Sequence, residues 1–459
     1  MLKWILLSIY ILSILTVIFI ERKRPTEALL WVFILICLPY FGTLLYLIFG
    51  NTTWIKWKKQ KSEKIEIPKQ TVPISSLSSE DEQVMHFNYV YNQSPITSYT
   101  NIQTYTDGKS HYEQLFHDID QAKSTIYIEF YTIHNDIIGQ NFIQHLTAKA
   151  KQGLDVFILC DSFANLNTPH SFYTEFKKAN GKIIRVKPYL THYRLHRKIV
   201  VIDQEIAYIG GMNIGKQYAN LAEKKNPWRD TQVRLQGECV QNLMYCFLQD
   251  WLDAQKNKNK AETLHYIQNR PKKQYEPTKN LCQFIMGGVD TDKESVKMVY
   301  LSMIRSAKRS IQIQSPYFIP DTSILDALKT AAASGIHVEL MIPGIEASFF
   351  LDPVTTYYTG QLLQYGAKVY KYNGYIHAKT MSIDDELCAI GSVNMDMRSL
   401  QVDDEICGIF YENQFVEHYR NIYETDKQHS IPYSLQQFNN RGNAEKMKEG
   451  FFLLFAPLM

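Results

Sequence analysis

A spaced pattern of polar residues occurs twice in this chain, and the second copy follows the first by 181 residues. The second copy reads H-x-K-x4-D-x6-G-S-x-N, and its residues are His377, Lys379, Asp384, Gly391, Ser392 and Asn394. The first copy has Gly in place of Ser, and its residues are His196, Lys198, Asp203, Gly210, Gly211 and Asn213. Average residue usage gives one such pattern by chance in roughly one chain in 10⁵. Two copies therefore indicate an internal duplication.

The residues between the polar positions predict strands. Residues 199–202 and 206–209 are apolar runs separated by polar residues, which predicts a buried strand and the strand that returns beside it. Side chains two positions apart on a strand share a face, so each histidine lies beside the lysine that follows it. The glycine pairs suit a close backbone approach, which leaves Asn213, Asn394 and Ser392 as candidate donors to a substrate phosphate.

These residue types suit phosphodiester chemistry. One imidazole can attack phosphorus while the other protonates the leaving group, and two lysines with two asparagines can hold a phosphate. A single histidine on a strand is usually a core or surface residue, but two copies in register favour a functional role. The seven cysteines form no C-x-x-C pair, so neither a disulfide framework nor a zinc site is indicated, and a reducing compartment fits best. The net charge of +3 neither requires nor excludes nucleic acid.

At these residues the sequence resembles the phospholipase D superfamily, whose members carry two such HKD motifs. The resemblance implies two similar α/β halves that meet at one shared active site, and a reaction that proceeds through a phosphohistidine without a metal or cofactor. It also implies the catalytic set, which is His196, Lys198, Asp203, His377, Lys379 and Asp384. Both aspartates lie at junctions between a strand and a turn, where Asp commonly bonds local backbone, so we treat them as structural members of the motif.

A carboxylate that can orient a histidine follows each motif. Asp230 ends the triplet Trp228-Arg229-Asp230 after the first motif, and Glu405 follows the second. By family resemblance, each accepts a hydrogen bond from the imidazole of its own half, which fixes the tautomer and stabilises the imidazolium. The chain departs from the family pattern at Asp403, where Asn is expected. This departure puts a supporting role of position 403 in doubt.

Alternating helical and strand patterns predict an α/β fold with mostly parallel pairing. Residues 122–128 match residues 307–313, and residues 153–156 match residues 335–338, at offsets of 185 and 182. Two halves of similar plan follow from these offsets. The predicted boundaries are a first half at 96–255, a linker at 256–280, a second half at 281–430 and a C-terminal tail at 431–459.

The chain begins with two apolar runs, at residues 4–20 and 28–50. Because a bilayer requires about 20 residues per helix, residues 1–53 are predicted to form a transmembrane helical hairpin. A secretory signal peptide is the rival interpretation of the first run. The charged residues 21–24 that follow, without a small-residue cleavage site, argue against it.

Residues 54–95 are predicted as a basic juxtamembrane segment and linker. Four lysines lie within residues 54–61, so the positive-inside rule places the catalytic part in the cytoplasm, with the protein multi-pass in a bacterial cell membrane. A contact with anionic lipid is favoured for these lysines over a merely solvated linker.

Three stretches at residues 24–31, 38–42 and 46–50 resemble the second membrane helix of bacterial cardiolipin synthases of the phospholipase D type. The plan of two membrane helices, a linker and two HKD halves is also similar to that family. The apolar residues 451–459 end much as those proteins do, and are short enough to enter either a membrane interface or a groove in the core.

The resemblance implies transfer of a phosphatidyl group from one phosphatidylglycerol to another, giving cardiolipin and glycerol. His196 is expected to attack and His377 to act as the acid, an assignment made by analogy because the two motifs are nearly equivalent. A phospholipase that accepts water or a different alcohol, a nuclease of the same superfamily and a catalytically silent scaffold remain alternatives. Nucleic acid is not an expected partner, and the residues indicate no oligomeric state.

Overall fold

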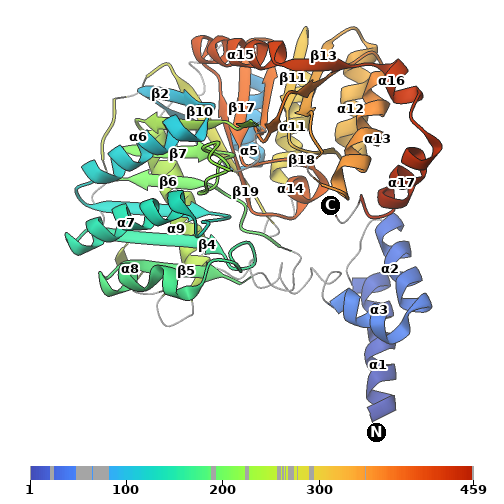
Figure 1. The fold of residues 1–459 in the computed structure, drawn as a ribbon, viewed down its shortest axis with the longest axis horizontal. Helices are drawn as coiled ribbons and strands as arrows, with labels where there is room; N and C mark the ends of the chain where they lie inside the picture. The colour runs from blue at the N-terminus through green and yellow to red at the C-terminus, as the bar shows by residue number, and fades with distance from the viewer. Residues whose placement is uncertain are drawn as a thin grey trace.

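Two mixed β-sheets, each with its own helices, form the body of the protein (Figure 1). The computed structural model describes residues 2–20, 25–47, 65, 82–187, 193–222, 227–255, 260, 263, 265–266, 273–276, 278–288, 294–346, 348–456 and 459. The predicted linker at 256–280 lies mostly outside these described residues.

The first half contains a seven-stranded sheet. Its strands, in spatial order, are β2 (Asn101–Tyr105), β9 (Gln232–Gln236), β7 (Ile206–Gly210), β6 (Ile199–Ile202), β3 (Thr125–Phe130), β4 (Asp155–Asp161) and β5 (Lys182–Val186). Its helices are α6 (Gly108–Gln121), α7 (Ile137–Lys151), α8 (Thr174–Lys178) and α9 (Cys239–Ala254). Helix α9 contacts β3, β6 and β9 and also reaches the second sheet.

The second half contains a nine-stranded sheet. Its strands, in spatial order, are β1 (Thr97–Ser98), β10 (Leu281–Gly287), β19 (Glu405–Phe410), β17 (Leu387–Gly391), β16 (Thr380–Ile383), β11 (Ser310–Gln314), β13 (His337–Pro343), β14 (Lys368–Tyr372) and β20 (Ser430–Tyr433). Its helices are α5 (Glu82–Tyr91), α11 (Ser295–Ser306), α12 (Thr322–Ala333), α13 (Leu351–Leu363), α14 (Met397–Gln401), α15 (Asn413–Gln428), α16 (Leu435–Asn439) and α17 (Asn443–Leu453). From β10 to β14 the strand order repeats that of the first sheet, which confirms two halves of one plan.

The prediction of mostly parallel pairing is wrong. Only β3–β4–β5 and β11–β13–β14 pair in parallel, through helical crossovers, and the other neighbours in both sheets are antiparallel. The motif itself is the reason, because a three-residue connection that contains a tight turn joins its two strands. Asp203 and Gln204 have φ of 52° and 60°, and Asp384 and Asp385 have φ of 52° and 65°. Turns with positive φ at both central residues close antiparallel hairpins.

The predicted boundaries shift at both ends of the second half. Helix α5 lies in the predicted linker and β1 lies at the start of the predicted first half, yet both join the second half: α5 packs on α11, and β1 pairs with β10. At the other end, β20 pairs with β14, and α17 packs on α13. Residues 82–98 and the tail therefore complete the second half.

The N-terminal residues form short helices, α1 (Leu2–Leu15), a π-helical turn at Thr16–Ile20, α2 (Pro25–Cys37) and α3 (Pro39–Leu45). Pro39 separates α2 from α3, because a residue before proline avoids helical geometry, and Leu38 has φ −133° and ψ 69°. Val17, Trp31, Leu35 and Tyr46 form a small buried cluster that joins these helices. Over the described part of the chain, no single helix has both the length and the apolar character needed to cross a bilayer, so the predicted transmembrane hairpin is not confirmed.

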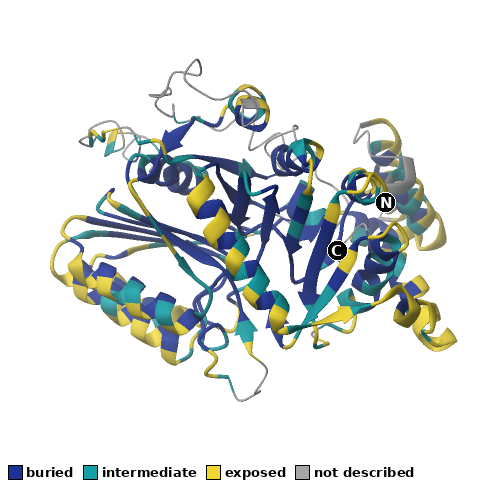
Figure 2. Ribbon diagram, turned by 90° about the horizontal axis from the view of Figure 1, so that it is seen from above, coloured by how far each residue is buried: buried dark blue, intermediate teal, exposed yellow. Residues whose placement is uncertain are grey.

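A shared core joins the two halves. One buried cluster combines Leu243 and Phe247 of α9 and Ile209 of β7 with Ile390 of β17 and Ile406 of β19. Figure 2 shows the two buried sheets meeting at the centre of the molecule, with exposed residues on the outer helices. In each half, the segment that precedes the motif strands is brought toward the other half by this packing.

Candidate active site

Short backbone pairings between the halves position both histidines. Strand β8 (Trp228–Arg229) of the first half pairs in parallel with β15 (Tyr375–Ile376) of the second, and the His377 amide donates to the Arg229 carbonyl at 2.6 Å. Leu195 makes the corresponding bridge to Asp404, and the His196 amide donates to the Asp404 carbonyl at 2.9 Å. Each histidine therefore lies beside the residue that precedes the carboxylate of the opposite half.

The side chains pair across the halves in the same way. Nδ1 of His196 lies 2.8 Å from Oε1 of Glu405, and Nδ1 of His377 lies 2.6 Å from Oδ2 of Asp230. The prediction that each carboxylate orients the histidine of its own half is therefore wrong in its pairing. A carboxylate accepts, so Nδ1 carries the proton in each pair and Nε2 remains available for chemistry. Both histidine side chains are 13% exposed, and their carboxylates are buried.

The motif lysines are buried beside these pairs. Nζ of Lys198 donates to the His196 carbonyl at 2.6 Å, and Nζ of Lys379 donates to the His377 carbonyl. Burial lowers the pKa of Lys198 to about 7 and that of Lys379 to about 8. Burial disfavours the charged form of both lysines, and the negative charge of a bound phosphate would stabilise that form. The two lysines therefore form the cationic floor of an anion site.

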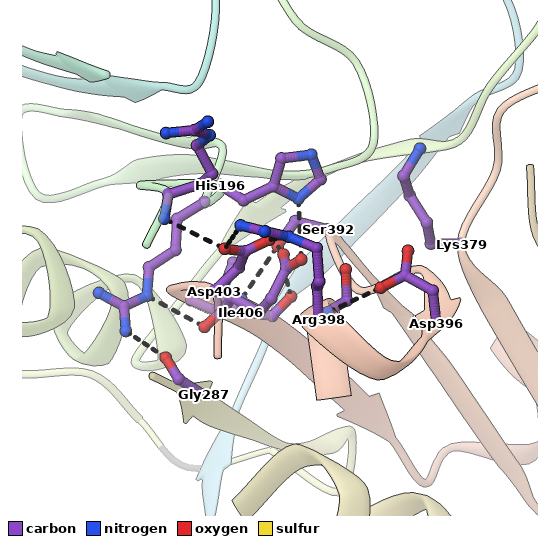
Figure 3. A network of polar contacts seen from close by, with 12 residues as sticks. His196, Gly287, Lys379, Ser392, Asp396, Arg398, Asp403 and Ile406 are labelled. Atoms are coloured by element: carbon purple, nitrogen blue, oxygen red, sulfur yellow. Dashed lines mark hydrogen bonds and ion pairs between the residues drawn. The ribbon is translucent and has the colours of Figure 1, made fainter. Parts of the chain in front are cut away.

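Both histidines respond to the two lysines, which indicates one shared site. Burial and then Lys198 lower the pKa of His196 well below its ordinary value, and Lys379 contributes in the same direction. Burial and then Lys379 lower the pKa of His377 to about 3, and Lys198 again contributes. Figure 3 shows the Lys379 side chain of the second half beside the network of polar contacts around His196.

The two carboxylates differ in charge state. Burial alone raises the pKa of Asp230, but Lys379 and His377 outweigh it, so the pKa lies below its ordinary value. Burial raises the pKa of Glu405 to about 7, although Lys198 and the Ser392 hydroxyl lower it in part. Asp230 is therefore ionised at neutral pH, whereas Glu405 titrates there.

Ser392 was predicted as a donor to a substrate phosphate, but its hydroxyl has protein partners instead. Its hydroxyl donates to Oε2 of Glu405 and accepts from the Ile406 amide at 3.0 Å (Figure 3). A hydroxyl has a single proton, so this proton is already used. At the equivalent position of the first half, a Cβ on Gly211 would lie 2.1 Å from Oδ1 of Asp230, which explains why Gly replaces Ser there.

The two motif asparagines also differ. Asn213 accepts from the Thr132 amide at 3.2 Å and donates to the Tyr218 hydroxyl at 2.7 Å, so most of its carboxamide serves its own half. Asn394 is 8% exposed, and its Oδ1 has no hydrogen-bond partner among the described residues. This oxygen is open to a donor group of a ligand, whereas a phosphate oxygen could be held only by the hydrogens on Nδ2.

The motif aspartates hold backbone, as the predicted structural role requires. The Asp203 carboxylate accepts from the amides of Lys123, Ser124 and Thr125 at 2.7–2.9 Å. Asp384 accepts in the same way from the amides of Lys308, Arg309 and Ser310. Each aspartate thus ties the hairpin turn of its motif to the start of β3 or β11. Asp403 accepts from the Arg194 amide at 3.1 Å and pairs with Arg398 at 3.0 Å.

Aromatic rings that the motifs do not contain enclose the histidines. Tyr131 lies 4.9 Å from His196 between ring centroids, and Trp228 lies 5.2 Å from His377. Tyr131 immediately follows β3, at the carboxyl end of a parallel strand, where sites commonly form. That position was the one signal in the sequence that could have identified it. Among the described residues, no group of three or more His, Cys, Asp and Glu side chains could hold a metal ion.

Known proteins share this plan over the whole chain. Residues 115–251 and 300–427 match the family model described as cardiolipin synthase, PLD-like domain, and residues 8–51 match the phospholipase D-nuclease N-terminal model. The chain is 33% identical to the cardiolipin synthase of Listeria welshimeri, with all of both chains covered. It is also 33% identical to the major cardiolipin synthase of Bacillus subtilis, with 99% of each covered. The crystal structure of a phosphatidylserine synthase from Haemophilus influenzae has the same fold, with a TM-score of 0.65 at 15% identity over 82% of this chain and 97% of that one.

Proposed function

The chain belongs to the cardiolipin synthase family of phospholipase D-like enzymes, and on that premise we propose that it transfers a phosphatidyl group from one phosphatidylglycerol to another. The products are cardiolipin and glycerol. The observation that carries this proposal is the pair of crossed contacts, His196 with Glu405 and His377 with Asp230, at the centre of a chain that matches these enzymes end to end.

In the first step, Nε2 of neutral His196 attacks the phosphorus of one phosphatidylglycerol, and a P–N bond forms. Burial and Lys379 lower the pKa of His377 to about 3, so the bound phosphodiester, together with Asp230, must supply the negative charge under which His377 takes up a proton at Nε2. The bond between phosphorus and the glycerol oxygen then breaks, and His377 gives this proton to that oxygen. The ionised Asp230 supports this role, because an adjacent negative charge stabilises the imidazolium before transfer. The product of this step is a phosphatidyl-histidine and free glycerol.

In the second step, His377 accepts the proton of a primary hydroxyl from the second phosphatidylglycerol. The resulting oxygen attacks phosphorus, the P–N bond breaks, and cardiolipin leaves. Lys198, Lys379, the Asn394 carboxamide and the remaining N–H of Asn213 hold the phosphoryl oxygens while charge develops on them. One phosphodiester is exchanged for another of similar energy, so no nucleotide is required.

A membrane position for this chemistry is part of the proposal. Trp4, Leu12 and Phe19 of the N-terminal helices are exposed by 60–73%, and Leu29 and Phe33 of α2 by 64–69%. Soluble surfaces rarely present apolar groups so densely, so we assign these helices to membrane anchoring, with the catalytic halves on the cytoplasmic side. This location gives both histidines access to phosphatidylglycerol and other anionic lipids.

The C-terminal tail adds a second apolar contact. Phe452 and Ala456 are buried against Ile319 and Val354, so one face of the tail fills a groove in the core. The other face leaves Phe451 and Leu454 exposed by 58% and 65%. We assign this exposed face to the membrane interface.

A product assay in phosphatidylglycerol vesicles tests the proposed reaction. The wild-type protein is expected to release glycerol and cardiolipin in equal amounts, while His196→Ala and His377→Ala lose both products. His145→Ala is the matched control, because His145 also pairs with an aspartate, Asp120 at 2.7 Å, but lies on the outer surface. Phosphatidic acid without cardiolipin would show a hydrolase instead, and full activity in His196→Ala would refute the mechanism.

A further inference from the structure

Two buried arginines that do not belong to the recurring motif residues contact the histidine-orienting carboxylate residues. Arg197 follows His196 directly and is 2% exposed, and Arg229 precedes Asp230 directly and is 3% exposed. The guanidinium groups donate to backbone carbonyls and carboxylates. Their contacts join the two halves to the helices behind the sheets.

Arg197 connects three elements. Its Nε donates to the Glu405 carbonyl at 3.0 Å, and its Nη2 donates to the Gly287 carbonyl of β10 at 2.6 Å (Figure 3). Its Nη1 forms an ion pair with Asp250 of α9. The residue next to one catalytic histidine therefore fixes the backbone of that histidine's own carboxylate partner.

Arg229 makes the corresponding connection for the other pair. Its Nη1 donates to the Asp230 carbonyl at 2.6 Å. Its Nε and Nη2 contact the carboxylate of Asp426 in α15 at 3.1 and 2.7 Å. Helix α15 follows β19 as α9 follows β9, so the two acidic anchors come from corresponding helices.

The two arginines come from different positions of the repeat. At the motif offset, the residue that corresponds to Arg197 is Ala378, and the residue before Glu405 that corresponds to Arg229 is Asp404. The duplicated sequence therefore does not require this shared arrangement. One arginine lies next to a motif histidine, and the other lies next to a histidine-orienting carboxylate.

We propose that Arg197 and Arg229 are positioning residues, each of which clamps the backbone of one histidine-orienting carboxylate to a helix of the opposite half. This proposal rests on the proposed function, because it assigns the clamps to the two histidine–carboxylate pairs of the transfer reaction. A guanidinium suits the task, since its planar fork can serve two backbone carbonyls and a carboxylate at once. Displacement of a catalytic group by about 1 Å costs on the order of 10²-fold in rate.

A buried polar side chain stands at the same strand position behind each clamp. Gln314 of β11 donates to Oδ2 of Asp426 at 2.8 Å. Glu129 stands at the corresponding position of β3, and its side chain is fully buried. Burial and then Asp250 raise the pKa of Glu129 well above its ordinary value.

The test removes one clamp together with its helix partner. The double variant Arg197→Met with Asp250→Asn is compared with Arg234→Met and Asp118→Asn. The second pair is also a buried Arg–Asp ion pair, at 2.6 Å between β9 and α6, but it touches no residue of the site. Replacing both partners avoids leaving Asp250 as an unpaired buried charge, although Asp404, 3.7 Å from Nη2 of Arg197, loses this partner. Thermal unfolding, kcat, KM and the pH profile are measured for both.

Both double variants are expected to unfold at similar temperatures. Only Arg197→Met with Asp250→Asn should lose kcat, by about 10², with KM changed less than about twofold and the acid limb of the pH profile displaced. Arg197→Lys, which keeps the charge but not the fork, should lose kcat similarly. Glu129→Gln should keep kcat within about twofold, because Gln already serves the other clamp.

Equal kcat in the two folded double variants would overturn the proposal, as would full activity in Arg197→Lys. The comparison uses whatever phosphodiester turnover the wild-type enzyme shows. If the wild type releases phosphatidic acid instead of cardiolipin, the proposed function fails, yet the clamp can still be tested on that hydrolysis. The two failures are therefore distinguishable.

Discussion

The two histidine–carboxylate pairs have the same backbone geometry but different chemistry. Each imidazole reaches across the halves to a buried acid, and both histidines are equally exposed. Asp230 is short, has Gly211 beside it and is ionised. Glu405 is longer by one methylene, accepts from Ser392 and has a pKa of about 7. Duplication thus kept the scaffold, while the side chains diverged in a way that supports different roles for His377 and His196.

The largest effect is expected from neutralising the ionised acid. Asp230→Asn should lower kcat by roughly 10³, because the proposed general acid His377 loses the charge that stabilises its imidazolium. Glu405→Gln should lower kcat by only about 10², because Glu405 already spends part of its time protonated. Steady-state cardiolipin synthesis at pH 7 measures both. Equal losses would show that the two pairs are chemically equivalent.

A smaller but still large effect is expected when the first half is given the serine of the second. Gly211→Ser should lower kcat by about 10², because the new Cβ displaces the Asp230 carboxylate. Gly442→Ser is the control, since a Cβ at that position meets nothing within 4 Å. Activity in vesicles and thermal unfolding of both variants check this. An active Gly211→Ser enzyme would mean that Asp230 has room to move without loss of function.

The smallest effect is expected at Ser392. A hydroxyl that donates to a carboxylate favours its ionised form, so Ser392→Ala should raise the pKa of Glu405 and move the acid limb of the kcat profile to higher pH. The loss at pH 7 should be about tenfold, as expected for a hydrogen bond to a charged group. Ser382→Ala, which removes another buried serine of the same sheet, should leave the limb in place. An unchanged acid limb in Ser392→Ala would show that the protonation state of Glu405 does not control kcat.

Much of this arrangement could be predicted from the repeat. The motif spacing predicted both hairpins and both histidine–lysine pairs, because strand periodicity and turn chemistry are local properties. The two acids were predicted from family resemblance. Crossed pairing could not be predicted, since it depends on β8 and β15 meeting between the halves. The engagement of Ser392 with Glu405 also depends on this packing. The helical crossovers give parallel pairs, but the turn inside each motif makes its two strands antiparallel, so parallel pairing is less extensive than predicted.

Pairing of the terminal segments was equally beyond a local pattern. Strand β1 is two residues long and gains its place only by pairing with β10, nearly two hundred residues later. Arg197 and Arg229 were visible in the sequence, but their shared function was not, because they occupy different positions of the repeat. Long-range contacts of this kind require the assembled fold.

Mapping the covalent intermediate tests the central claim most directly. Wild-type enzyme is mixed with phosphatidylglycerol in vesicles, quenched under alkaline conditions during turnover, and digested for mass spectrometry. The account predicts a phosphatidyl adduct on His196. An adduct on His377, or turnover with no histidine adduct on either residue, would contradict it.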